Sequence, residues 1–101
     1  MDQMLKASLD WINEIAYPHS EFNHPNDENK VKCASRALDK MGVVIDADEV
    51  ATYCRSLRMP KGAIDKIVDW YSRPKSLRLK SGLQFKYSDL KRIWKERINN
   101  E

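Results

Sequence analysis

The helical character of the chain is clearest in residues 46–74, which read DADEVATYCRSLRMPKGAIDKIVDWYSRP. Asp46 stands before a helical pattern, and Glu49 follows three residues later, which is a capping-box arrangement. Pro60 interrupts the pattern and fits the first turn of a second helix, which Pro74 then ends. The stretch therefore predicts two short helices that are joined by a tight turn.

The same helical spacing of apolar residues continues on both sides of this stretch. We predict one helix from about Gln3 to Ala16 and a second from near Asn26 to Met41, where Gly42 supplies the stop. A polar loop bracketed by Pro18 and Pro25 separates them. A last helix follows Ser88 and carries its apolar face at Leu90, Ile93, Trp94 and Ile98.

Residues 77–87 change to a period of two. Leu77 and Leu79 alternate with basic residues, Ser81-Gly82 can turn, and a second alternating run follows. This segment either pairs as a short hairpin or runs as an extended arm. We therefore predict a mainly α protein, a compact array of about five helices in one domain over residues 1–101, with this segment before the last helix.

Composition is that of a globular protein, because 42% of the 101 residues are hydrophobic and 33% are charged. The first residues do not have the charged start and apolar block of a signal peptide, and no apolar run approaches the length of a membrane span. We expect a cytoplasmic protein of bacterial type that makes no membrane contact. Cys33 and Cys54 are then expected to be reduced, buried thiols.

Residue types that could carry chemistry are present, but not at the required spacings. His19, His24, Cys33 and Cys54 lack the close pairing of a zinc site. The chain has no phosphate-binding glycine loop, no nucleophile elbow and no His-Glu-x-x-His pattern. We therefore predict no catalytic residues, no cofactor and no metal. The three tryptophans are expected to pack in the core rather than to stack on bases; they are Trp11, Trp70 and Trp94.

Charge is distributed very unevenly along the chain. Residues 1–54 carry five Lys/Arg against ten Asp/Glu, whereas residues 55–97 carry thirteen against four. Such asymmetry is typical of proteins that meet an acidic partner, although a merely solvated surface or a protected edge strand gives the same pattern. The residues predicted to bind a polyanion lie on or near the segment of changed period; they are Lys61, Arg73, Lys75, Arg78 and Lys80.

Two functions fit these features. The first is a non-enzymatic interaction module whose basic half binds an acidic protein or another polyanion. The alternative is a winged-helix-like DNA-binding protein, because the apolar spacing over residues 53–67 is typical of a helix-turn-helix and residues 77–87 stand where a wing would grip phosphate. Against the alternative, Arg58 occupies a turn position that favours Gly, and Asp65 and Asp69 would repel phosphates.

A family resemblance rests on the segment from Gly42 to Trp70. Its matching residues are Gly42, Val43, Ala47, Val50, Gly62, Lys66, Val68 and Trp70, together with Leu9 to Ile12 upstream. With these residues the chain resembles the YoaC-like family of small uncharacterised enterobacterial proteins. The resemblance implies a mainly helical, cytoplasmic protein without an assigned activity, cofactor or binding residue. At two positions, Cys54 and Arg58, this chain departs from the Ala and Gly of the family.

Overall fold

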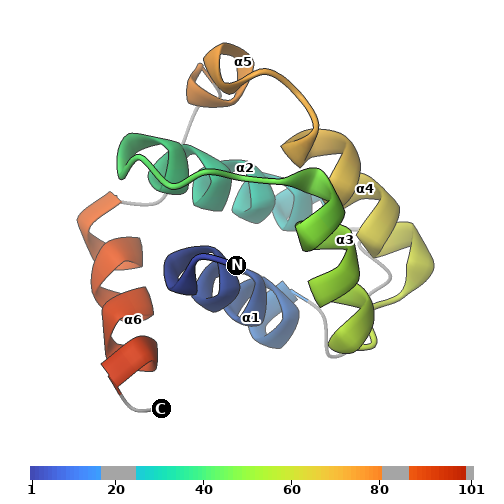
Figure 1. Ribbon diagram of the computed structural model, residues 1–101, viewed down its shortest axis with the longest axis horizontal. Helices are drawn as coiled ribbons and strands as arrows, with labels where there is room; N and C mark the ends of the chain where they lie inside the picture. Colours follow the sequence, from blue (N-terminus) through green and yellow to red (C-terminus); the bar gives the residue numbers. More distant parts are fainter. Residues whose placement is uncertain (17–24, 81–86, 100–101) are drawn as a thin grey trace.

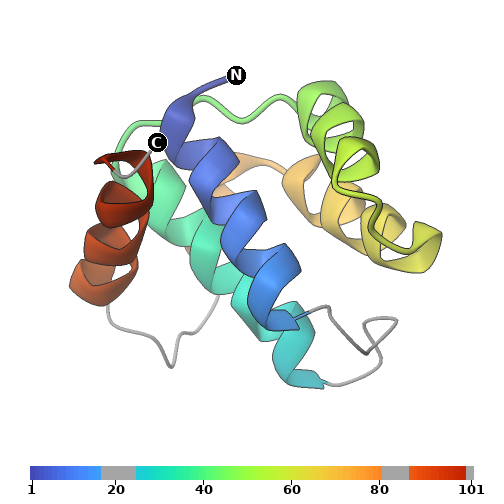
Figure 2. The same cartoon turned by 90° about the horizontal axis from the view of Figure 1, so that it is seen from below.

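An antiparallel pair of helices, α1 (Gln3–Ala16) and α2 (Pro25–Lys40), forms the centre of the protein (Figures 1 and 2). The computed structural model describes residues 1–16, 25–80 and 87–99, and in these ranges the chain forms six helices and no strand. The apolar residues of α1 at helical spacing, Leu5, Leu9 and Ile12, are fully buried. Both predicted helices are therefore confirmed, with bounds within a residue of those expected.

The helices α3 (Ala47–Ser56) and α4 (Lys61–Tyr71) pack against each other and cover one side of the central pair (Figure 1). The side chain of Asp46 accepts hydrogen bonds from the backbone N–H groups of Asp48 and Glu49, which confirms the predicted cap of α3. Arg58, in the turn between the helices, has φ of 59°, a left-handed conformation that favours glycine. The turn thus keeps its geometry although an arginine occupies it.

On the opposite side, α6 (Tyr87–Asn99) packs on α1 and α2 (Figure 1). Its Leu90 and Trp94 are buried in the core, and an ion pair of 2.7 Å between Arg97 and Glu14 joins its last turn to α1. The expectation that the tryptophans pack inside is confirmed, since Trp11, Trp70 and Trp94 are all buried. The helices thus enclose one compact core, and no described helix is long and apolar enough to cross a membrane.

The first arm of the segment predicted as a hairpin is helical instead. Residues Lys75–Leu79 form α5, a single turn that packs on α2 (Figure 1). A strand over these residues would place Leu77 in the core and Arg78 at the surface. In the structure Leu77 is exposed and Arg78 is buried. The predicted strand is therefore wrong at residues 77–79. The Ser81-Gly82 turn and residues 83–86 lie outside the described part of the chain, as do His19 and His24.

Candidate anion-binding site

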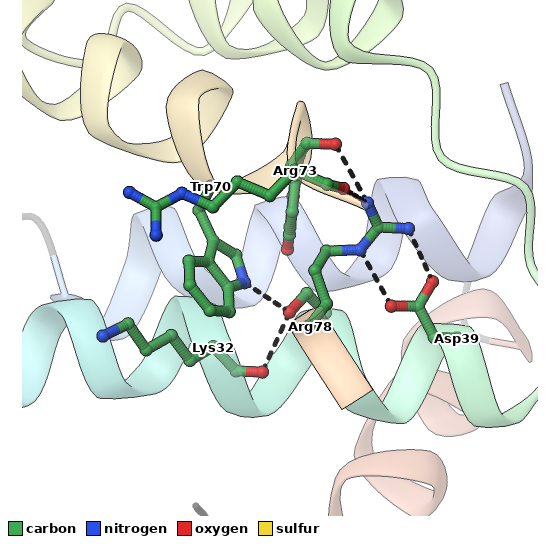
Figure 3. A network of polar contacts seen from close by, with 7 residues as sticks. Lys32, Asp39, Trp70, Arg73 and Arg78 are labelled. Carbon is green, nitrogen blue, oxygen red and sulfur yellow. Dashed lines mark hydrogen bonds and ion pairs between the residues drawn. The ribbon is translucent and has the colours of Figure 1, made fainter. Parts of the chain in front are cut away.

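Trp70, near the end of α4, is held against α2 by a hydrogen bond. Its Nε1–H donates to Oγ of Ser35 at 2.7 Å, and the Ser35 hydroxyl donates in turn to the backbone carbonyl of Lys32 at 2.9 Å (Figure 3). Ser35 is fully buried, and Trp70 is 9% exposed. Because both ends of this short chain of hydrogen bonds are satisfied inside the protein, the ring has a fixed orientation between the two helices.

Cations from two helices converge on the Trp70 ring. Nζ of Lys32, from α2, lies 5.1 Å from the ring centroid, and the guanidinium carbon of Arg73, just after α4, lies 5.2 Å from it. Figure 3 shows the ring between these two side chains. Each distance is within the range of a cation–π interaction, which stabilises a partly exposed pair by about 0.5–1 kcal/mol.

A hollow of about 130 Å³ opens beside the ring, between α2 and α4. Val31 and Trp70 give it an apolar part, and Lys66 joins Lys32 and Arg73 as a third lining cation. Two carboxylates complete the lining; they are Glu28, 3.6 Å from Nζ of Lys66, and Asp69, 3.1 Å from the Arg73 guanidinium. Three cations against two carboxylates leave the lining with one net positive charge.

Arg78, one of the predicted polyanion-binding residues, is instead part of the interior. Its guanidinium donates to both carboxylate oxygens of Asp39, from Nε at 2.8 Å and from Nη2 at 2.9 Å, and its Nη1 donates to the backbone carbonyls of Tyr71 and Arg73 (Figure 3). The hydrogen bond with Asp39 is the main cause that raises the pKa of Arg78. The ion pair of Arg78 and Asp39 connects α5 to α2. Because the Arg78 side chain is only 9% exposed, its charge is not accessible to a binding partner.

The other predicted residues separate into two places. Arg73, Lys75 and Lys80 are exposed and belong to the short segment that leaves α4 and forms α5, and of these three Arg73 lines the hollow. Lys61 begins α4 at the end remote from Arg73, about 15 Å away along the helix axis. A second group of cations lies on α6, on the other side of the molecule; it consists of the half-buried Lys91 and the exposed Arg92 and Lys95.

The buried side chains next to this region are not reactive. Cys33 and Cys54 are buried and form no disulfide, as predicted, and burial raises the pKa of Cys54 to about 12. Burial also raises the pKa of Tyr71. Both groups therefore stay protonated near neutral pH. Among the described residues, no three His, Cys, Asp or Glu side chains gather closely enough to hold a metal ion.

Of the seven residues that line the hollow, Arg73 alone was predicted from the sequence to bind a partner; the others are Glu28, Val31, Lys32, Lys66, Asp69 and Trp70. Lys32 and Glu28 belong to the acidic half of the chain, and only the packing of α2 on α4 brings them to Arg73. Comparisons of the chain with protein-family models, with curated proteins and with solved structures gave no match. The fold and the site thus define a mainly helical domain with a small charged hollow between two of its helices.

Proposed function

We propose that the protein is a non-enzymatic interaction module that binds an acidic protein segment. The binding surface, called the Trp70 basic surface, consists of three cations that line the hollow and two exposed cations of the α5 segment that follows Arg73 in the chain; they are Lys32, Lys66, Arg73, Lys75 and Lys80. The observation that carries the proposal is the convergence of Lys32 from α2, Lys66 from α4 and Arg73 from just after α4 beside an indole ring that Ser35 holds in place. Membership of the YoaC-like family and a cytoplasmic location stay predictions.

A surface of this kind suits weak, salt-sensitive recognition of an acidic chain. The exposed cations attract an acidic partner over distances of about one Debye length, roughly 8–10 Å in physiological salt. The carboxylates Glu28 and Asp69 stand among them and oppose a partner of very high negative charge density. An acidic protein segment, with its charges spaced along a chain, meets this mixed surface with less repulsion than a nucleic acid backbone does.

Duplex DNA is the alternative partner, and the packing of α3 on α4 across a tight turn favours it. The exposed face of α4 that would read bases carries Asp65 and Asp69 between its cations. The wing expected at residues 77–79 is a helical turn, and Arg78 is committed to Asp39. These features favour the acidic protein segment over DNA.

Charge reversal on two surfaces tests the proposal. The triple variant Arg73→Glu, Lys75→Glu, Lys80→Glu alters the Trp70 basic surface, and the control variant Lys91→Glu, Arg92→Glu, Lys95→Glu makes the same change of net charge on α6. The probe is a fluorescent peptide of eight glutamates, and fluorescence anisotropy measures its Kd. Because each exposed charge pair contributes up to about 1 kcal/mol, the first variant is expected to weaken binding about tenfold or more.

The control variant is expected to weaken binding less than about threefold. Equal losses in both variants would mean that the peptide responds only to net charge, and no loss in the first would place binding elsewhere; either result contradicts the proposal. A duplex of 20 base pairs is titrated in parallel. Tighter binding of the duplex than of the peptide, lost in the first variant, would make DNA the partner instead.

A further inference from the structure

We infer that the hollow beside Trp70 is a specific pocket for a single carboxylate, a glutamate side chain of the acidic segment, and this inference rests on the proposed function. The pocket differs from the rest of the Trp70 basic surface because its cations surround a recess with an apolar wall. Val31 is 2% exposed and Trp70 9% exposed, so both are positioned by the core and not by the ligand.

Charge balance selects a carboxylate. The lining cations Lys32, Lys66 and Arg73 face the lining carboxylates Glu28 and Asp69, which leaves one net positive charge. One carboxylate neutralises this charge. A phosphate, which carries close to two negative charges at neutral pH, would leave an excess negative charge beside the two carboxylates. The pocket therefore favours a monoanion over a dianion.

Size and shape select a glutamate. The hollow is small, at about 130 Å³, whereas pockets for drug-sized ligands measure about 300–1,000 Å³. Its size suits a carboxylate with its methylene groups better than a nucleotide. The methylenes of a glutamate can lie along Val31 and the indole of Trp70, while Arg73 can donate two parallel hydrogen bonds to the carboxylate.

The guanidinium of Arg73 can serve the ligand without a conformational change of the backbone. It is paired with Asp69 at 3.1 Å, but both side chains are well exposed, at 46% and 70%. Such a pair contributes little to stability, so exchanging Asp69 for a ligand carboxylate costs little. Lys32 lines the same hollow from α2, so a ligand in the hollow contacts both α2 and the segment that follows α4.

The test is an NMR titration that follows the indole N–H signals of the three tryptophans. The probes are the peptide Ac-(Glu-Ser)₄-NH₂ and its neutral control Ac-(Gln-Ser)₄-NH₂, at constant ionic strength. The Glu peptide is expected to shift the Trp70 signal in a saturable way, with the Trp11 and Trp94 signals unchanged because neither of these rings lines the hollow. The Gln peptide is expected to shift none of them.

Variants then separate the pocket from the general surface. Arg73→Gln and Lys32→Gln are each expected to raise the Kd of the Glu peptide about fivefold to tenfold. Lys95→Gln on α6 is the matched control and should leave the Kd within about twofold. If either pocket variant unfolds, as judged by circular dichroism, the other one still decides the outcome, since the two residues come from different helices.

Binding of the Glu peptide with an unmoved Trp70 signal, or with a Kd that neither pocket variant changes by more than twofold, overturns the pocket. The proposed function then stands or falls separately, on the two charge-reversal variants. Inorganic phosphate that shifts the Trp70 signal at a lower concentration than the monoanion butyrate would overturn the choice of a carboxylate. No binding of the octaglutamate peptide at all overturns the proposed function, and the pocket with it.

Discussion

Arg73 and Arg78 are five residues apart and were predicted from the sequence to play the same part, but their surroundings are opposite. Arg73 is exposed, lies over the Trp70 ring and pairs with Asp69, which is also exposed. Arg78 is buried. The hydrogen bonds described above connect its guanidinium to Asp39 and to the backbone carbonyls of Tyr71 and Arg73. One arginine is available for a partner, and the other holds the fold.

The difference teaches that burial, and not the local density of positive charge, decides what a cation does. A buried guanidinium has lost its water and depends on its carboxylate, so removing either partner leaves an uncompensated charge. An exposed guanidinium keeps its water and can exchange one carboxylate for another at little cost. The predictions below use this contrast, and they run from the largest expected effect to the smallest.

Removal of the buried pair is expected to have the largest effect. Arg78→Gln should lower the free energy of unfolding by about 3–5 kcal/mol, because it leaves the Asp39 carboxylate buried without its partner. Urea denaturation followed by circular dichroism measures the change. The double variant Arg78→Met, Asp39→Leu should recover more than half of the loss, since no buried charge remains. A loss below about 1 kcal/mol for Arg78→Gln would mean that the pair is not buried in solution.

Arg73 lies over the Trp70 ring, and the next prediction concerns Ser35, which holds that ring in place. Ser35→Ala removes the acceptor of the Trp70 Nε1–H group and should cost about 1–3 kcal/mol, because a buried donor is left without a partner. Ser72→Ala is the matched control. Its hydroxyl is exposed and bonds only to a carbonyl of its own helix, so the expected change is within about 0.5 kcal/mol. Equal effects in both variants would contradict the account.

Arg58 offers a third environment, in which the backbone and not the charge decides. Its φ of 59° is unfavourable for a residue with a side chain, so Arg58→Gly is expected to stabilise the protein by about 1 kcal/mol. The same change three residues earlier, Arg55→Gly, lies within α3 and should destabilise by about 1 kcal/mol. Thermal denaturation of both variants checks the sign. A loss of stability in both would mean that Arg58 is not in the left-handed region.

The exposed pair of Glu14 and Arg97 should give the smallest effect. The hydrogen bond from Arg97 is the main cause that lowers the pKa of Glu14 from its ordinary value of 4.5. The contribution of this ion pair to stability is therefore fully present above the pKa that Glu14 has in the unfolded chain. It is lost as the pH falls through the lowered pKa of Glu14 in the folded protein. Because Glu14 is 57% exposed, solvent screening limits the gain to about 0.5 kcal/mol.

Urea denaturation of the wild type and of Glu14→Gln at two pH values measures this contribution. The wild type should be the more stable protein at about pH 7, and the difference should vanish at about pH 2–3, where Glu14 is protonated. Glu96→Gln on α6 serves as the control. A difference that grows as the pH falls would contradict the pairing.

Much of the fold could be predicted from the sequence, because helix periodicity and caps are local signals. The helix from Gln3 to Ala16 and the cap at Asp46 are both as expected. The error at Leu77 and Leu79 arose because alternation in a short segment does not reveal a distant carboxylate. The sequence of α2 did contain a weak signal of these buried contacts, because the polar residues Ser35 and Asp39 lie four residues apart beside its apolar stripe. In the structure Ser35 accepts a hydrogen bond from Trp70, and Asp39 accepts one from Arg78.

The candidate site could be predicted only in part. Arg73 was found because it lies in the basic half, as were its neighbours Lys75 and Lys80. Lys32 was missed because it belongs to the acidic half, and only the tertiary packing of α2 on α4 brings it to the ring. Net charge along the chain therefore locates the surface, whereas the hollow beside Trp70 depends on contacts that no local pattern records.

The most direct test of the contrast measures the free energy of unfolding of the wild type and of Arg73→Gln, each with and without the Ac-(Glu-Ser)₄-NH₂ peptide. Without peptide, the two proteins should agree within about 0.5 kcal/mol. Peptide at about 100 times the wild-type Kd should stabilise the wild type by about 2.7 kcal/mol and the variant, with its fivefold to tenfold higher Kd, by about 1.4–1.8 kcal/mol. A variant that is several kcal/mol less stable without peptide, or that gains as much from it as the wild type, would contradict the separate roles of Arg73 and Arg78.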